Sequence, residues 1–150
     1  MRFFSIRRSF ERSNLSAYIE ADLTQKLTIC TTCKFSKESA FDRNGKTGGE
    51  TLRNKLEILR DKRGTRLNIV GHECLWACKH SCAVLLEDEK RTGYLAGYFA
   101  PEDNDAQSIL DWCEAHDRTE DGNVPFVEWP HGMRGHFIAR IPGKDAAKTS

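Results

Sequence analysis

The stretch Cys74-Leu-Trp-Ala-Cys78-Lys-His-Ser-Cys82 carries three cysteines at four-residue intervals, shortly after the strand-like run Leu67-Asn-Ile-Val70. A second pair, Cys30-Thr-Thr-Cys33, ends an earlier strand-like run that begins at Leu27. Five of the six cysteines therefore lie in two short clusters, each at the end of an expected strand. Thiolates spaced by two or three residues can converge on one soft metal centre without straining the backbone. The two clusters predict a metal or iron–sulfur site.

The composition is that of an ordinary globular domain. A chain of 150 residues with 39% hydrophobic and 30% charged residues can bury a core of its own. A net charge of +1 is too small to indicate nucleic acid or an anionic membrane as the partner. No apolar run reaches the roughly 20 residues that span a bilayer, and the opening lacks a secretory signal. We therefore expect a cytoplasmic protein whose reduced cysteines bind metal rather than form disulfides.

The expected domain organisation is one domain between two less ordered ends. Residues 1–25 are Arg-rich, but Glu20 and Asp22 do not fit an organelle transit peptide, so this part is interpreted as an N-terminal extension. Residues 26–142 form the expected metal-binding domain, and residues 143–150 form a polar, disordered tail. No internal repeat or linker divides the domain.

The expected elements alternate between strands and helices. Strands are predicted at residues 27–30, 67–70, 82–86 and 92–99, with the last two joined as a hairpin. A helix is predicted from about residue 50 to 63, with Leu52, Leu56 and Leu59 on one apolar face and Gly64 as its C-cap. The preceding glycines, Gly45 and Gly48-Gly49, are expected to be turn points in a loop.

A second helix is predicted to start after Pro101, with Asp103 as its N-cap and His116 as a favourable charge at its C-terminal end. Cys113 lies on the expected buried stripe and is interpreted as a small core residue. The acidic residues between 101 and 121 predict a solvated helix face, or alternatively a surface that steers a basic redox partner. Residues 122–142 are expected to wrap the domain as an extended segment whose apolar residues are buried, namely Val124, Phe126, Trp129, Phe137 and Ile141.

The order of these elements, β-α-β-β-β-α, is that of a thioredoxin-like α/β domain, with a mixed sheet of about four strands and flanking helices. The residues from 26 to 142 resemble the DUF1636 family of predicted metal-binding proteins, through the two cysteine clusters, Gly93-Tyr94 and the closing Arg140-Ile141-Pro142. Cys74-Leu-Trp-Ala-Cys78 also resembles the C-L-G-A-C segment of thioredoxin-like [2Fe-2S] ferredoxins, with Trp76 where glycine is usual. The resemblance implies a ferredoxin-like cluster protein, and it suggests a link with cobalamin or cobalt metabolism.

Four cysteines meet the requirement of an iron–sulfur centre for four thiolates, often supplied by two loops: Cys30, Cys33, Cys74 and Cys78. Cys82 is a fifth candidate metal ligand, which could replace Cys78 or be a buried residue at the start of its strand. A structural zinc site is the nearest alternative, since zinc also takes four thiolates. The C-x-x-x-C spacing favours iron–sulfur, because zinc sites more often use two C-x-x-C knuckles. His72 and His80 flank the loop and are expected to be outer donors or solvated side chains.

These residues predict an electron-transfer or metal-binding protein rather than an enzyme, with an unidentified redox partner protein. Two alternatives stay open: a zinc-stabilised interaction module, and a thiol–disulfide oxidoreductase that uses Cys30 and Cys33. The second needs an activated thiol at a helix N-terminus, and turn-rich sequence separates this pair from the expected helix. The sequence leaves the oligomeric state open.

Overall fold

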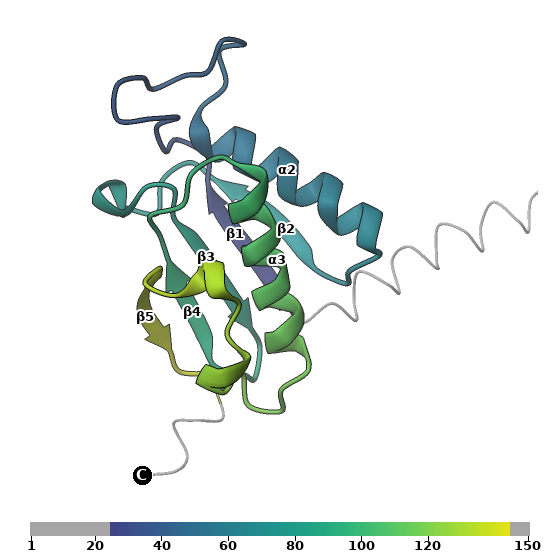
Figure 1. Ribbon diagram of the computed structural model, residues 1–150. Coiled ribbons are helices and arrows are strands. Elements are labelled where there is room, and N and C mark those ends of the chain that lie inside the picture. Colours follow the sequence, from purple (N-terminus) through teal and green to yellow (C-terminus); the bar gives the residue numbers. More distant parts are fainter. Residues whose placement is uncertain (1–24, 145–150) are drawn as a thin grey trace, which may run out of the picture.

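The protein folds as a five-stranded mixed sheet with two helices packed side by side on one of its faces (Figure 1). The structure is a computed structural model and describes residues 25–144. The elements are β1 (Gln25–Cys30), α2 (Gly48–Arg63), β2 (Asn68–His72), β3 (Val84–Asp88), β4 (Gly93–Ala96), α3 (Asp103–Asp117), β5 (Phe137–Ile141) and three short 3-10 helices, η1 (Cys78–His80), η2 (Phe126–Glu128) and η3 (His131–Met133). Apart from residues 25, 143 and 144, the expected N-terminal extension and tail lie outside the described residues.

The sheet has the strand order β2-β1-β3-β4-β5. β1 and β2 are parallel and are connected through α2, while β1 with β3 and β3 with β4 are antiparallel. This arrangement is that of a thioredoxin-like α/β fold, as the order of the expected elements predicts. The expected number of strands was four, and the structure adds β5, which pairs with β4 so that Tyr94 lies opposite Arg140. The prolines and glycines before β5 indicate irregular structure, so the sequence did not predict this strand. Its pairing with β4 is a tertiary contact, which local sequence patterns do not show.

The helix α2 is bounded by strong local signals at both ends. Thr47 is its N-cap, and its hydroxyl accepts from the backbone N–H of Glu50, while the Glu50 carboxylate accepts from the N–H of Thr47. Gly64 ends the helix in the left-handed region, at φ 68°, as predicted. Leu52 and Leu56 are fully buried against the sheet. The helix begins two residues earlier than expected, because Gly48 and Gly49 form its first turn rather than a loop.

The helix α3 is packed beside α2 and carries much of the core. Ile109, Leu110 and Cys113 are buried to 1% exposure or less, which confirms the prediction for Cys113. The prediction of Asp103 as N-cap is wrong, because Glu102 occupies that position and Asp103 is the first helical residue. The Asp103 carboxylate instead accepts from Lys55 of α2 at 2.7 Å.

The expectation of a charged His116 at the end of α3 is also wrong, since its side chain is fully buried. The Nε2–H of the neutral ring donates to the Thr92 carbonyl at 2.7 Å, and Nδ1 accepts from the Gln25 amide at 2.9 Å. Burial lowers the pKa of His116. The cation at this helix end is supplied by Arg91, whose Nη1 lies 3.2 Å from the carbonyl oxygen of His116 and 2.9 Å from that of Asp117.

The segment between α3 and β5 is ordered by an aromatic cluster rather than by regular structure. The rings of Trp112, Trp129 and Phe137 lie between 4.6 and 5.7 Å apart, centroid to centroid. Val124 is buried as predicted, but Phe126 is 59% exposed and Ile141 is 38% exposed, so burial of these two was wrongly expected.

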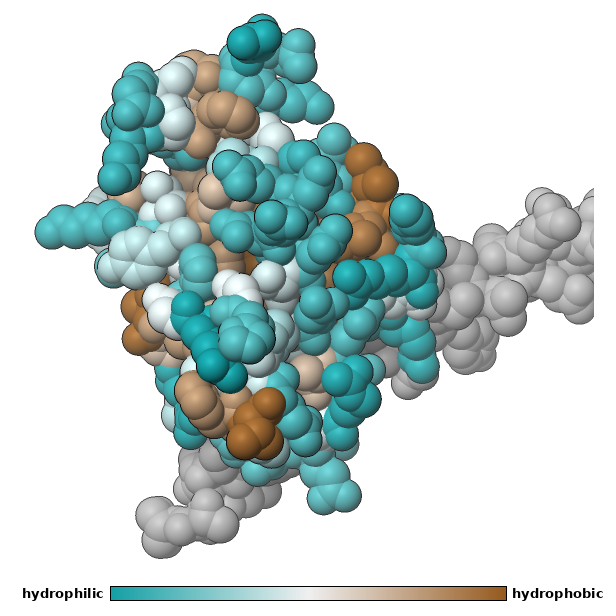
Figure 2. Space-filling view, viewed as in Figure 1, coloured by the Kyte–Doolittle hydropathy of each residue, from teal (hydrophilic) through white to brown (hydrophobic). Residues whose placement is uncertain are grey.

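The helix-bearing face is mainly hydrophilic, with small, separate hydrophobic areas (Figure 2). Within residues 25–144, no helix combines the length and apolar character needed to cross a membrane.

Candidate metal centre

Five cysteines gather at the end of the sheet where β1 and β2 terminate. Because β1 and β2 are parallel neighbours, with Cys30 opposite His72, the loops that follow them leave the same edge (Figure 1). Cys30 ends β1, and Cys33 follows in the loop to α2. The loop from β2 to β3 supplies the other three cysteines, with η1 in its middle: Cys74, Cys78 and Cys82.

The loop that carries Cys30 and Cys33 lies directly against the first turn of α2. A Cβ atom built on Gly49 would be 1.8 Å from the Cys30 carbonyl oxygen, and one on Gly48 would be 2.2 Å from that of Lys34. The Gly49 N–H also donates to the Cys33 carbonyl at 3.3 Å. Only glycine permits this approach, so Gly48 and Gly49 position the first cysteine pair. In sequence, this Gly-Gly pair next to Thr47 predicts a turn, whereas in the structure it forms the first turn of α2.

Cys33 and Cys82 form the inner, buried pair of thiols. Cys33 is 6% and Cys82 is 1% exposed, and their side chains are hydrogen-bonded. The Cys33 thiol donates, so the pKa of Cys33 is raised well above its usual value by this bond and by burial. The same bond lowers the pKa of Cys82. Cys30, which is 3% exposed, also bonds to Cys33 and thus joins the pair.

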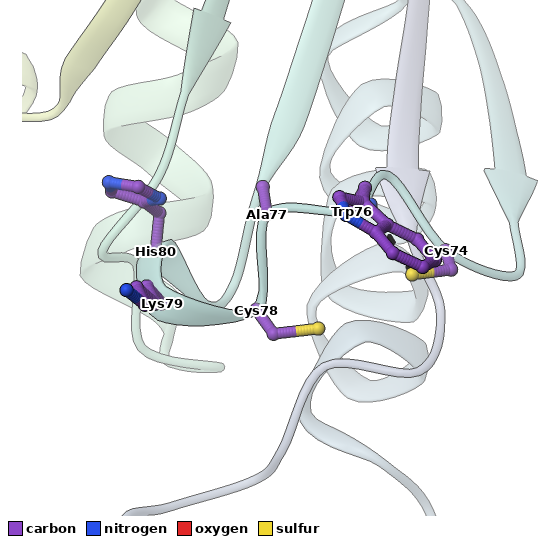
Figure 3. Close-up of a pocket in the computed structure, with 6 residues that line it drawn as sticks. All are labelled: Cys74, Trp76, Ala77, Cys78, Lys79 and His80. Atoms are coloured by element: carbon purple, nitrogen blue, oxygen red, sulfur yellow. Dashed lines mark hydrogen bonds between the residues drawn. The ribbon is translucent and has the colours of Figure 1, made fainter.

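Cys74 and Cys78 form the outer pair. The Trp76 N–H donates to the Cys74 sulfur at 3.3 Å. The pKa of Cys78 is raised, first by the negative charge of Cys74 and then by partial desolvation and a hydrogen bond to Cys74, with smaller contributions from Cys30 and Cys33. In Figure 3 the Cys78 side chain extends toward the side on which Cys74 and Trp76 lie, whereas Lys79 and His80 point to the other side. These loop residues line a shallow pocket of about 340 Å³.

The donor chemistry of this cluster fits a thiolate-bound metal centre. All five cysteines have free thiols, and their electrostatic interactions link Cys33 with Cys30 and Cys82, and Cys78 with Cys74. The Cys30 thiol has the Glu73 backbone carbonyl as a further partner, at 3.9 Å. Within residues 25–144 no three Cys, His, Asp or Glu side chains lie at metal-ligand spacing, and Cys78 is the exposed cysteine of the five. The choice of individual ligands stays a prediction.

The two flanking histidines differ in what they contact. The Nδ1 atom of His72 lies 3.1 Å from the Cys74 carbonyl oxygen and 3.3 Å from the Cys74 nitrogen, so this ring supports the loop backbone. The His80 ring packs edge-on against Tyr98 at 4.8 Å. The contact with Tyr98, which follows β4, could not be expected from the spacing of the cysteines.

The fold and the site together define a thioredoxin-like domain with a cysteine cluster at the carboxyl ends of its two parallel strands. The chain belongs to the DUF1636 family of proteins of unknown function, whose model matches residues 27–143. No curated protein matches the chain. Among solved structures, a thioredoxin-like [2Fe-2S] ferredoxin from Aquifex aeolicus is similar, with 14% sequence identity and a TM-score of 0.46. The similarity covers 77% of this chain and 91% of the ferredoxin.

Proposed function

We propose that the protein is an iron–sulfur electron carrier whose [2Fe-2S] centre is held by Cys30, Cys33, Cys74 and Cys78. The observation that carries the proposal is that two loops leaving the same edge of the sheet bring five free thiols to one end of the domain. Iron–sulfur clusters require four thiolates, and the buried Cys113 is the one cysteine that lies elsewhere in the core. In this proposal the protein exchanges electrons with a redox partner protein in the cytoplasm. A role in cobalamin or cobalt metabolism rests on the family resemblance alone.

When bound, such a centre accepts and releases single electrons, with a potential set by hydrogen bonds to sulfur and by solvent exposure. In this chain the Trp76 N–H donates to Cys74, which stabilises negative charge on that sulfur. The burial of Cys30 and Cys33 keeps water from the inner side of the site. The exposure of Cys78 leaves the outer side open to a partner. Cys82 lies beneath the loop as a hydrogen-bond partner of Cys33 and as a substitute ligand.

The thiol–disulfide alternative is disfavoured by the state of the first cysteine pair. Exchange requires an exposed thiol with a lowered pKa. Cys30 is 3% and Cys33 is 6% exposed, and the pKa of Cys33 is raised. The zinc alternative uses the same four thiolates, so the nature of the bound metal decides between an electron carrier and a structural module.

The test is metal and sulfide analysis of anaerobically purified protein, together with visible absorption before and after dithionite. We expect iron and acid-labile sulfide in equal amounts and absorption bands that bleach on reduction. Changing Cys30, Cys33, Cys74 or Cys78 singly to Ser should strongly deplete the iron, whereas the matched control Cys113→Ser should retain it. Zinc without sulfide would refute the electron carrier, and loss of iron from Cys113→Ser but not from Cys78→Ser would refute the ligand set.

The role of Cys82 requires its own variants, because this thiol contacts a proposed ligand. We expect Cys82→Ser to keep the centre with shifted absorption bands, since the bond to Cys33 changes but four ligands remain. Cys78→Ser should keep a fraction of the centre through Cys82, and the double variant should keep none. Equal and complete loss of iron in both single variants would instead make Cys82 an obligatory ligand.

A further inference from the structure

A basic groove runs beside the cysteine cluster. It has a volume of about 480 Å³, and its charged lining residues are all lysines: Lys34, Lys37 and Lys79. The groove adjoins the cluster directly, because the Cys82 thiol donates to the Lys34 carbonyl at 3.9 Å and Lys79 follows Cys78 in the chain.

The three lysines are exposed, and within residues 25–144 none of them makes an ion pair. The acidic residues of α3 are in the opposite situation, because basic residues of other elements pair with them. Lys55 pairs with Asp103 at 2.7 Å, and Arg63 pairs with Asp111 at 2.6 Å. Arg91 pairs with Asp117 at 3.1 Å. The expected acidic steering surface on α3 is therefore largely neutralised, whereas the three lysines beside the thiols have no ion-pair partner among the described residues.

Two exposed aromatic side chains lie near these lysines: Tyr98 lines the groove, and Trp76 lines the neighbouring pocket that Lys79 also lines. Trp76, between the outer cysteines, is 93% exposed, and Tyr98, in the groove wall, is 55% exposed. Both have a positive φ, 56° and 64°, which is unfavourable for bulky side chains. Large aromatic residues at the centre of a surface are the usual anchors of protein–protein contacts. Their exposure beside the thiols indicates a surface built for contact.

We propose that Lys34, Lys37 and Lys79, with Trp76 and Tyr98, form the docking surface for a partner protein that presents an acidic patch. The role of this surface rests on the proposed function, because a redox partner has to approach the metal centre closely to exchange electrons. Unpaired lysines attract carboxylates and raise the rate of encounter, while the aromatic rings hold the complex. The structure favours a protein over a nucleic acid, since the chain has a net charge of only +1 and the groove is lined by no arginine.

The test measures binding of a fluorescein-labelled decaglutamate peptide to the purified protein, by fluorescence anisotropy at low and at raised salt. The variant Lys34→Glu/Lys79→Glu should weaken binding roughly tenfold or more, because attraction becomes repulsion. The control Lys62→Glu/Lys90→Glu makes the same charge change at exposed lysines outside the groove and should weaken binding less than about twofold. Equal weakening by both variants, or no binding at low salt, would overturn the proposal.

The aromatic anchors are tested with a second peptide in which one central Glu is replaced by Phe. We expect it to bind more tightly than decaglutamate to the wild type, and Trp76→Ala should remove this gain while leaving decaglutamate binding nearly unchanged. No gain from Phe would overturn the anchoring role. Tighter, groove-dependent binding of an oligothymidylate than of either peptide would overturn the assignment to a protein partner.

Peptide binding needs no electron transfer, so its outcome is separate from that of the metal analysis. If the purified protein contains zinc and binds the peptides through the groove, the electron-carrier proposal is refuted and the docking-surface proposal stands. An iron–sulfur protein that binds neither peptide would keep the electron carrier and refute the docking surface.

Discussion

At the scale of single residues, His116 and Trp76 are both in unusual states. The His116 hydrogen bonds require a neutral ring, and Trp76 has a positive φ. The His116 ring is held between Gln25 and Thr92, and a proton added to Nδ1 would face the amide N–H of Gln25. Trp76 has the left-handed conformation that glycine adopts readily, and this costs other residues about 1–2 kcal/mol. Its exposed ring gains little packing in return. His116 is therefore explained by its surroundings, whereas the packing of the Trp76 ring does not offset the cost of its backbone conformation.

His116 predicts a loss of stability in mild acid. Because its pKa is lowered in the folded state, the unfolded chain takes up the proton first as the pH falls below the ordinary value of about 6.5. The free energy of unfolding should then fall by at most about 1.4 kcal/mol for each pH unit until the folded-state pKa is reached. Arg91 supports this direction, whereas Asp88 and Asp117 oppose it.

Urea unfolding of the metal-loaded protein between pH 5 and 8 checks this prediction. His116→Gln should lower the stability more at pH 8 than at pH 5, because the wild type loses the neutral-ring contribution in acid. The exposed His131, changed to Gln, is the matched control and should leave the pH profile unchanged. An identical difference between wild type and His116→Gln at both pH values would contradict the prediction.

At the scale of elements, the N-terminal turn of α2 supports the first cysteine pair. The capping box of Thr47 and Glu50 fixes where the helix begins, so Gly48 and Gly49 lie under the loop. Thr47 also donates through its hydroxyl to the Thr31 carbonyl, between the two cysteines. The helix start and the thiol loop therefore form one structural unit. A substitution at the start of the helix should change metal binding by the cysteines.

Gly49→Ala should disturb both the stability and the metal content. The added methyl group would overlap the Cys30 carbonyl, 1.8 Å away, and this backbone cannot move without moving the thiol. We expect a loss of about 1–3 kcal/mol in the free energy of unfolding, typical of overpacking, with a lower iron content per chain. Asn54→Ala, at an exposed position of the same helix, should change stability by less than about 0.5 kcal/mol. Unchanged iron content in Gly49→Ala would refute the coupling.

At the scale of the whole molecule, the cysteine cluster lies at one end of the apolar core, and three of its five cysteines belong to that core: Cys30, Cys33 and Cys82. The core lies between the sheet and the two helices, where Leu27, Ile29, Leu56 and Leu110 are buried to 1% or less. Cys74 and Cys78 lie outside this core, on the loop between β2 and β3. The fold therefore has a source of stability that does not need the metal, unlike that of a zinc finger.

Removal of the metal should loosen the loops and keep the fold. We expect the far-ultraviolet circular dichroism of the metal-free protein to retain the signal of α2 and α3, because their burial against the sheet is unchanged. Amide hydrogen exchange should become faster in residues 31–35 and 73–82, and stay slow in β1 and β3. A random-coil spectrum after metal removal would contradict this prediction and show that folding requires the bound metal.

The sequence alone determined the features that depend on local spacing. Four features were predictable because each depends on residues close together in the chain. They are the two cysteine clusters, the apolar face of α2 with its Gly64 cap, the β3–β4 hairpin and the order of elements. Tertiary structure decided the pairing of Cys33 with Cys82, the cap that Arg91 provides for α3, the neutrality of His116 and the strand β5. It also paired four of the five acids of α3 with basic residues, and left three lysines beside the thiols without an ion pair among the described residues. These outcomes depend on residues far apart in the chain, and only packing in three dimensions sets their distance, burial and charge.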